Sequence, residues 1–124
     1  MPASLPAVAL VAEACPFGSA AVRDLLLDLG IASVVQARNG AEAVTSLADR
    51  APQLIVLDWN VPLVNAREIM SLARGGGADP AIVVTMSEPT RSAVEAAVAA
   101  GARAVVAKPF SPRDLRARLP LTSP

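Results

Sequence analysis

Apolar residues gather in five short runs along the chain, separated by longer stretches of mixed polarity. The runs occupy residues 8–11, 31–35, 54–57, 82–84 and 105–107. Short, nearly continuous runs rich in Val, Ile and Leu indicate strands that are buried on both faces of a sheet. The stretches between and after them predict helices near residues 17–29, 40–49, 65–74, 89–100 and 112–119.

Three of the predicted helices carry a start signal in which a short polar residue precedes an acid by three positions. The pairs are Asn39 and Glu42, Asn65 and Glu68, and Ser111 and Asp114. In this pattern the polar side chain caps free backbone N–H groups, and the acid faces the positive end of the helix. Gly30 and Gly101 predict left-handed caps at helix C-termini, and the glycine run at 75–77 ends the third helix.

Strands that alternate with helices predict a parallel sheet, because each connection is long enough to cross over and pack a helix on one face. We therefore expect a single doubly wound α/β domain over residues 1–124. Its core should extend from about residue 7 to residue 119, with residues 120–124 as a C-terminal tail. A chain of 124 residues has the size of one ordinary domain.

Polar residues follow or end four of the predicted strands. Glu13 follows the first, and Asp58, Thr85 and Lys108 end the third, fourth and fifth. In sheets of this kind the functional crevice lies beyond the carboxyl ends of the strands. Each residue taken alone has an ordinary explanation as a solvated acid, a β-branched strand residue or a surface lysine. Together they predict a pocket for phosphoryl transfer.

Composition removes several other chemistries. The chain contains no histidine and no tyrosine, which excludes a Ser-His-Asp triad, histidine-ligated zinc and a role as the phosphohistidine carrier. Lys108 is the only lysine, and the ten other basic residues are arginines. The sequence therefore uses a compact ammonium in place of a planar guanidinium only at the predicted pocket.

The charge pattern argues against nucleic acid and membrane partners. Eleven basic and eleven acidic side chains give a formal net charge of zero, spread along the chain. The single cysteine, Cys15, cannot form an internal disulfide, and the N-terminus lacks the basic start and apolar stretch of a signal peptide. No apolar run approaches the roughly 20 residues of a membrane span. We expect a cytoplasmic protein.

The four polar residues can be assigned roles in phosphoryl transfer. An ionised Asp58 would attack phosphorus and form a labile acyl phosphate. Mg²⁺ would bridge carboxylate and phosphoryl oxygens with few protein ligands, and Glu13 is its candidate partner. Thr85 would donate a hydrogen bond to one phosphoryl oxygen, while Lys108 would meet another as a point charge. The modification would be self-directed, so a turnover enzyme is not expected.

The segment Asp58-Trp59-Asn60-Val61-Pro62, followed by Thr85 and by Lys108-Pro109-Phe110, resembles receiver domains of two-component systems. The similarity covers about residues 7–119 and is greatest to the stand-alone chemotaxis type. It implies a flavodoxin-like fold with strand order 2-1-3-4-5, a cis peptide before Pro109, and Mg²⁺ bound partly through the backbone carbonyl of Asn60.

The same resemblance implies particular partners. A sensor histidine kinase or phosphotransfer protein would donate the phosphoryl group to Asp58. A downstream protein would bind the face formed by the fourth helix, fifth strand and fifth helix. Met1 favours a stand-alone regulator over a receiver cut from a hybrid kinase.

The sequence departs from the family pattern in three places. Ala14 stands where a second acid, ordinarily a direct Mg²⁺ ligand, would follow Glu13, so weaker metal binding is expected unless Glu13 replaces it. Residues 63–66 replace a Gly-containing loop that ends in Asp-Gly. Val105 replaces an aromatic side chain that changes position on phosphorylation. Cys15, taken as a buried thiol, is interpreted as a small hydrophobe and not as a ligand.

Two functions therefore stay open: a phosphorylatable switch, favoured by Asp58, Thr85 and Lys108, and a divergent pseudo-receiver that binds partners without phosphorylation, favoured by Ala14 and Val105. A flavodoxin-like cofactor protein is disfavoured, because no phosphate-binding loop follows the first strand. The fourth helix is apolar on more than one face, which indicates either a partner surface or an alanine-rich composition. The residues concerned are Ala93, Val94, Ala96, Ala97, Val98 and Ala100, and the arginines at 113, 116 and 118 offer a charged surface on the last helix.

Overall fold

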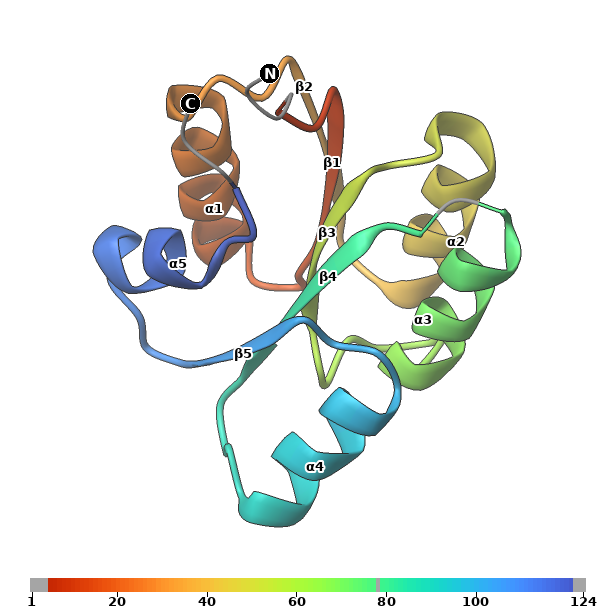
Figure 1. Ribbon diagram of the computed structural model, residues 1–124, viewed down its shortest axis with the longest axis vertical. Coiled ribbons are helices and arrows are strands. Elements are labelled where there is room, and N and C mark those ends of the chain that lie inside the picture. The colour runs from red at the N-terminus through yellow and green to blue at the C-terminus, as the bar shows by residue number, and fades with distance from the viewer. Residues whose placement is uncertain (1–4, 78, 122–124) are drawn as a thin grey trace.

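A computed structural model describes residues 5–77 and 79–121, in which five strands alternate with five helices (Figure 1). The strands are β1 (Val8–Ala12), β2 (Ser33–Ala37), β3 (Leu54–Asp58), β4 (Ala81–Met86) and β5 (Ala104–Ala107). The helices are α1 (Pro16–Asp28), α2 (Gly40–Arg50), α3 (Ala66–Gly75), α4 (Arg91–Ala99) and α5 (Pro112–Arg118). The predicted tail residues 122–124 lie outside the described residues.

All strand pairs are parallel, and the sheet has the order β2-β1-β3-β4-β5. This order confirms the flavodoxin-like prediction. The chain builds outward from β1 to one edge and then returns to add β3, β4 and β5 on the other side. The carboxyl ends of β1 and β3 therefore flank the point where strand order reverses, which is where ligands meet sheets of this type.

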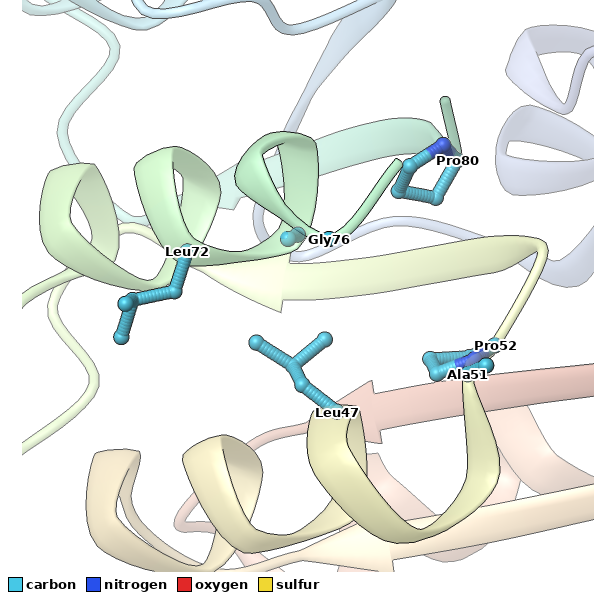
Figure 2. Close-up of a pocket in the computed structure, with 7 residues that line it drawn as sticks. Leu47, Ala51, Pro52, Leu72, Gly76 and Pro80 are labelled. Carbon is cyan, nitrogen blue, oxygen red and sulfur yellow. The ribbon is translucent and has the colours of Figure 1, made fainter. Parts of the chain in front are cut away.

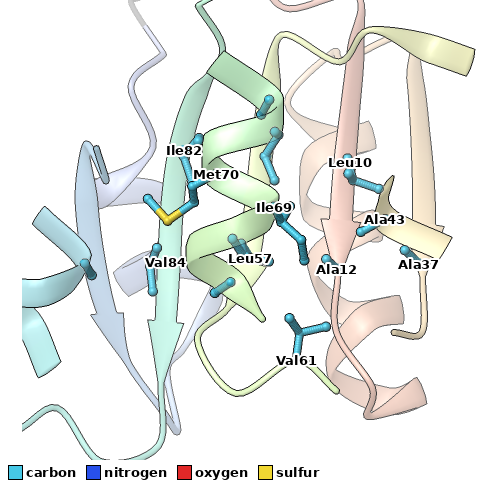
Figure 3. Close-up of a cluster of buried hydrophobic side chains, with 14 of the residues drawn as sticks. Leu10, Ala12, Ala37, Ala43, Leu57, Val61, Ile69, Met70, Ile82 and Val84 are labelled. Carbon is cyan, nitrogen blue, oxygen red and sulfur yellow. The ribbon is translucent and has the colours of Figure 1, made fainter. Parts of the chain in front are cut away.

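The two faces of the sheet are covered by different helices. In Figure 1, α1 and α5 lie on one side of the strands, and α2 and α3 lie on the other. The first side buries Val22 and Leu26 of α1 against Leu115 of α5 and the sheet. The second side buries Ile69 and Met70 of α3 against the sheet, as Figure 3 shows, and includes Ala97 of α4. Burial of apolar strands on both faces confirms the reading of the continuous hydrophobic runs.

The predicted helix caps are present. Asn39 and Asn65 each accept a hydrogen bond at 2.9 Å, from the backbone N–H groups of Glu42 and Glu68. Ser111 and Asp114 form a reciprocal capping box, with both hydrogen bonds at 3.1 Å. Gly30 and Gly101 have φ angles of 102° and 113°, in the left-handed region that glycine adopts at little cost. The peptide bond before Pro109 is cis, as the family resemblance implies.

The second strand begins later than predicted. The expected start at Ile31 was wrong, because the Ile31 backbone N–H closes the end of α1 by donating to the Leu26 carbonyl at 3.1 Å. The Ile31 side chain is buried with the helices α1 and α5. The fourth helix likewise begins at Arg91 and not at residue 89, because Thr90 caps it by accepting from the Ala93 N–H at 3.2 Å. Other boundaries differ from prediction by one or two residues.

Helices α3 and α4 are joined at their C-terminal ends. Arg74, in the last turn of α3, donates a hydrogen bond at 3.2 Å to the carbonyl oxygen of Ala100, which caps α4. Gly101 makes room for this contact, since a Cβ there would lie 2.1 Å from Nη1 of Arg74. The Arg74 guanidinium thus satisfies a carbonyl that the helix end leaves without an intrahelical partner.

Candidate functional site

The predicted site residues meet at one edge of the sheet. Glu13 follows β1, Asp58 is the last residue of β3, Thr85 is the next-to-last residue of β4, and Lys108 follows β5. Asp58 and Thr85 are register partners across β3 and β4. The side chains of Glu13 and Asp58 both contact Lys108. The structure thus brings together the residues that the sequence placed at strand ends.

Asp58 is mostly buried, with 8% of its surface exposed. Its Oδ1 accepts a hydrogen bond from the backbone N–H of Asn60 at 3.1 Å, and its Oδ2 lies 3.3 Å from Nζ of Lys108. The turn that follows is fixed by backbone hydrogen bonds from Trp59 to Thr85 at 2.9 Å and from Val61 to Asp58 at 3.1 Å. One carboxylate oxygen is therefore held by the backbone and the other faces a cation.

Lys108 is positioned by its backbone and shared by two acids. Its N–H donates to the Met86 carbonyl at 2.7 Å, and its Nζ donates to Oε1 of Glu13 as well as facing Asp58. Burial lowers the pKa of the Lys108 ammonium, but its hydrogen bond to Glu13 and the charges of Asp58 and Glu13 raise it by more. The net pKa lies above the ordinary value of 10.5, so Lys108 is a permanent cation at neutral pH.

Glu13 leans across the edge of the sheet toward Lys108. Its side chain is 12% exposed, and its Oε2 accepts a hydrogen bond from the backbone N–H of Cys15 at 3.3 Å. The Glu13 backbone is anchored in turn by donating to the Ala37 carbonyl at 3.0 Å. Glu13 and Asp58 therefore both contact the ammonium of Lys108.

Thr85 and Asn60 occupy contrasting positions. Thr85 is 3% exposed and stands beside Asp58 in the register of the sheet, and its role as a hydroxyl donor stays a prediction. Asn60 is exposed, and its backbone N–H is committed to Asp58. The predicted role of the Asn60 carbonyl as a metal ligand stays a prediction.

The expectation that Cys15 is a buried thiol was wrong. Cys15 is exposed and occupies the N-cap position of α1, which begins at Pro16. Its side chain makes no capping hydrogen bond. Cys15 contributes to the site through its backbone N–H, which holds Glu13.

Sequence reasoning missed an unusual loop residue beside the site. Leu63, five positions after Asp58, has a φ of 77° and is 79% exposed. A bulky side chain in the left-handed region is a backbone outlier that costs about 1–2 kcal/mol. The residue type does not predict this positive φ angle, because leucine rarely adopts it. Phe17 at the start of α1 is also exposed, at 88%.

Trp59 has a cationic neighbour that the sequence analysis did not single out. The guanidinium carbon of Arg67, in the first turn of α3, lies 5.6 Å from the centre of the Trp59 ring. This distance is within the range of a cation–π interaction. The eight-residue separation crosses a loop and a helix start, so no helical periodicity pointed to it.

The depressions on the surface differ in character. One of about 330 Å³ adjoins Glu13, and its lining includes the charged residues Arg23, Arg38 and Glu42. An apolar one of about 70 Å³ lies between α2 and α3, where Leu47 and Leu72 face each other (Figure 2). Pro52 and Pro80, which precede β3 and β4, also line it, so it lies at the opposite edge of the sheet from Asp58.

A doubly wound parallel sheet with Asp, Thr and Lys at its carboxyl edge defines the receiver class of signalling domain. The family model described as the response regulator receiver domain matches residues 9–120, and the chain belongs to this family. Among the described residues, none of the helices has the length and apolar character needed to cross a membrane.

Relatives in chemotaxis share most of their length with this chain. Chemotaxis protein CheY1 of Helicobacter pylori is 29% identical over 101 residues, covering 79% of this chain and 82% of that protein. Chemotaxis protein CheY of Bacillus subtilis is 27% identical, covering 82% and 84%. The solved structure of chemotaxis response regulator CheY4 of Vibrio cholerae superposes with a TM-score of 0.81 at 23% identity, covering 93% and 100%. This last similarity supports the fold.

Receiver domains generally bind Mg²⁺ at an acidic pocket, so the donor set at this site can be tested against that ion. Among residues 5–77 and 79–121, no three His, Cys, Asp or Glu side chains gather where they could hold a metal. Ala14 supplies no carboxylate, and the ammonium of Lys108 lies between Glu13 and Asp58. This arrangement does not fit a resident Mg²⁺, which prefers several oxygen ligands and is repelled by an adjacent cation.

Proposed function

We propose that this chain is a phosphorelay switch in which Asp58 accepts a phosphoryl group from the phosphohistidine of a sensor histidine kinase or a phosphotransfer protein. The observation that carries the proposal is the buried Asp58 carboxylate at the edge of a receiver fold, with Lys108 3.3 Å away. Phosphoryl transfer needs mainly positioning and charge neutralisation, and this pair offers both. A cytoplasmic setting is part of the proposal.

The transfer can be written with these residues alone. An Asp58 oxygen attacks phosphorus, the P–N bond to the donor imidazole breaks, and its electron pair returns to the ring nitrogen, which then takes a proton. The product is an acyl phosphate on Asp58. Lys108 compensates the charge on the phosphoryl oxygens, and the Thr85 hydroxyl donates to one of them. Attack by water later restores the carboxylate and releases inorganic phosphate. The chain modifies itself and turns over no separate substrate.

We further propose that the output is a change in binding of a downstream protein at the face formed by α4, β5 and α5. Val98 on α4 is 56% exposed, which leaves an apolar side chain on that face beyond those packed against the sheet. Arg113, Arg116 and Arg118 of α5 are also exposed. Val105 is half-buried on β5, so any switching has to use residues other than an aromatic at this position.

Incubation with acetyl phosphate or phosphoramidate, followed by intact mass spectrometry, tests the acceptor role. The expected result is an adduct of about 80 Da, the mass of one phosphoryl group, that Asp58→Asn abolishes. Asp49→Asn removes an exposed acid of α2 and is the matched control, which should label as the wild type does. If the Asp58→Asn variant is still labelled, a residue other than Asp58 is the acceptor.

A pseudo-receiver is the second candidate, favoured by Ala14 and Val105. It predicts no adduct under any of these conditions, and partner binding that is unchanged by Asp58→Asn. A partner captured equally by wild type and variant, with no labelling of either, would establish this alternative over the switch.

A further inference from the structure

The two acids of the site have their carboxylate oxygens occupied by the protein itself. Oδ1 of Asp58 accepts from the Asn60 N–H, and Oε2 of Glu13 accepts from the Cys15 N–H. The two other oxygens, Oδ2 of Asp58 and Oε1 of Glu13, both face Nζ of Lys108. Each of the four oxygens thus has a donor or a cation drawn from the chain.

Charge at the site is also close to balanced without a metal. Two carboxylates and one ammonium leave a single net negative charge, whereas a second acid at position 14 would leave two. A divalent cation entering between Glu13 and Asp58 would meet the Lys108 ammonium at close range in a partly buried setting, where like charges repel strongly. Both the missing acid and the placed lysine therefore oppose Mg²⁺.

We propose that Lys108 is the resident cation of this acceptor site and takes the place of a divalent metal, so that a phosphoryl group joins Asp58 without Mg²⁺. The inference rests on the proposed function and specifies the cofactor requirement of that same site. An ammonium carries three N–H donors. One is donated to Glu13, and Nζ also lies 3.3 Å from Oδ2 of Asp58, so a donor is left for a phosphoryl oxygen. Glu13 is then a positioning residue that keeps Lys108 at the edge of the sheet.

A single substitution should convert the site to the metal-dependent kind. Ala14→Asp restores the second acid, and Ala14→Asn is its matched control of similar shape without charge. Labelling of Asp58 by acetyl phosphate is measured in Mg²⁺ and in EDTA. Wild type and Ala14→Asn should label at similar rates in Mg²⁺ and in EDTA. The labelling rate of Ala14→Asp should be at least about tenfold lower in EDTA than in Mg²⁺, which is the usual size of the effect when the surroundings of a metal site are disturbed. A comparable loss in EDTA for the wild type would overturn the inference and leave the proposed function intact.

A second measurement does not depend on phosphorylation. Calorimetric titration with MgCl₂ should show binding to Ala14→Asp that is at least about tenfold tighter than to wild type, and Lys108→Met should also gain affinity because the competing ammonium is removed. Circular dichroism confirms that each variant is folded. If no variant forms an adduct, the proposed function fails, and this titration still decides whether Lys108 and the missing acid keep Mg²⁺ out of the site. Wild-type Mg²⁺ affinity equal to that of Ala14→Asp would refute it.

Discussion

A Cβ atom added to Gly40, the first residue of α2, would stand 2.2 Å from the carbonyl oxygen of Val64. Gly40 also donates its N–H to the Pro62 carbonyl at 2.7 Å. The loop that follows Asp58 is therefore packed directly on the start of α2, and the absence of a side chain at position 40 permits that contact. The position of the loop beside the acceptor depends on a residue in a different element.

Gly40→Ala should destabilise the protein by about 2 kcal/mol, because the new methyl group overlaps backbone atoms that have no room to move aside. Urea unfolding followed by circular dichroism measures the change. Gly75→Ala, at the last residue of α3, is the control: a Cβ there meets no atom within 4 Å, so the stability should not fall. Equal stability of Gly40→Ala and the wild type would show that the loop does not pack on α2.

Leu63→Asn should stabilise the protein by about 1 kcal/mol, because Asn tolerates the left-handed backbone that Leu occupies at a cost. The exposed Leu63 side chain gives up little burial in exchange. Thermal unfolding measures the effect. Leu72→Asn is the comparison: Leu72 is 48% exposed on α3, and Asn there should lower stability through its poorer helix propensity. A loss of stability for both variants would contradict the assigned strain.

Lys108→Met should lower the stability at pH 7 by about 1 kcal/mol, because it leaves Glu13 and Asp58 facing each other across a partly buried space. The pKa of Lys108 is raised above 10.5 in the folded chain. Its ammonium therefore favours folding at every pH below 10.5, and this contribution is lost as pH rises through the raised value. The difference between wild type and variant should hold from pH 7 to the unfolded pKa and shrink above it.

Unfolding measured across that pH range separates the ion pairs from general alkaline effects. Arg103→Met is the control, since Arg103 is exposed and forms no ion pair within the described part of the chain. Its stability should follow the wild type at each pH. A gap between wild type and Lys108→Met that widened above pH 10.5 would contradict the direction of the pKa shift.

Ser111→Ala should cost about 1 kcal/mol, the usual worth of a helix cap, because Ser111 accepts from the Asp114 N–H and so begins α5. Ser92→Ala, at an exposed position of α4, should change stability little. Chemical unfolding of both variants measures the difference. Equal effects would mean that the capping box adds nothing to the fold.

Features set by neighbouring residues were predictable from the sequence. The caps at Asn39, Asn65 and Ser111 join atoms within three residues of one another, so the pattern of polar and acidic residues is sufficient. The predicted start of β2 was wrong because Ile31 has a side chain typical of strands, but its N–H donates a hydrogen bond to the end of α1. Apolar character alone does not distinguish a strand residue from a buried residue that closes the end of a helix.

The sequence predicted which residues gather at the site, but not which of the acids pair with Lys108. Parallel strands bring their carboxyl ends to one edge, which placed Glu13, Asp58 and Lys108 together. Whether Lys108 pairs with Asp58 alone or also with Glu13 depends on the relative positions of β1 and β5, which no local pattern encodes. The conformation of Leu63 could not be predicted either, because leucine rarely adopts the positive φ angle that it has here.

The hydrogen bond from Arg74 to Ala100 restricts how α4 can move. A tilt of α4 that keeps this bond turns about the C-terminal end of the helix. The largest displacement is then at the N-terminal end of α4, beside the loop that follows Thr85. We therefore expect any tilt of α4 to move Arg91 most and the residues beside Gly101 least.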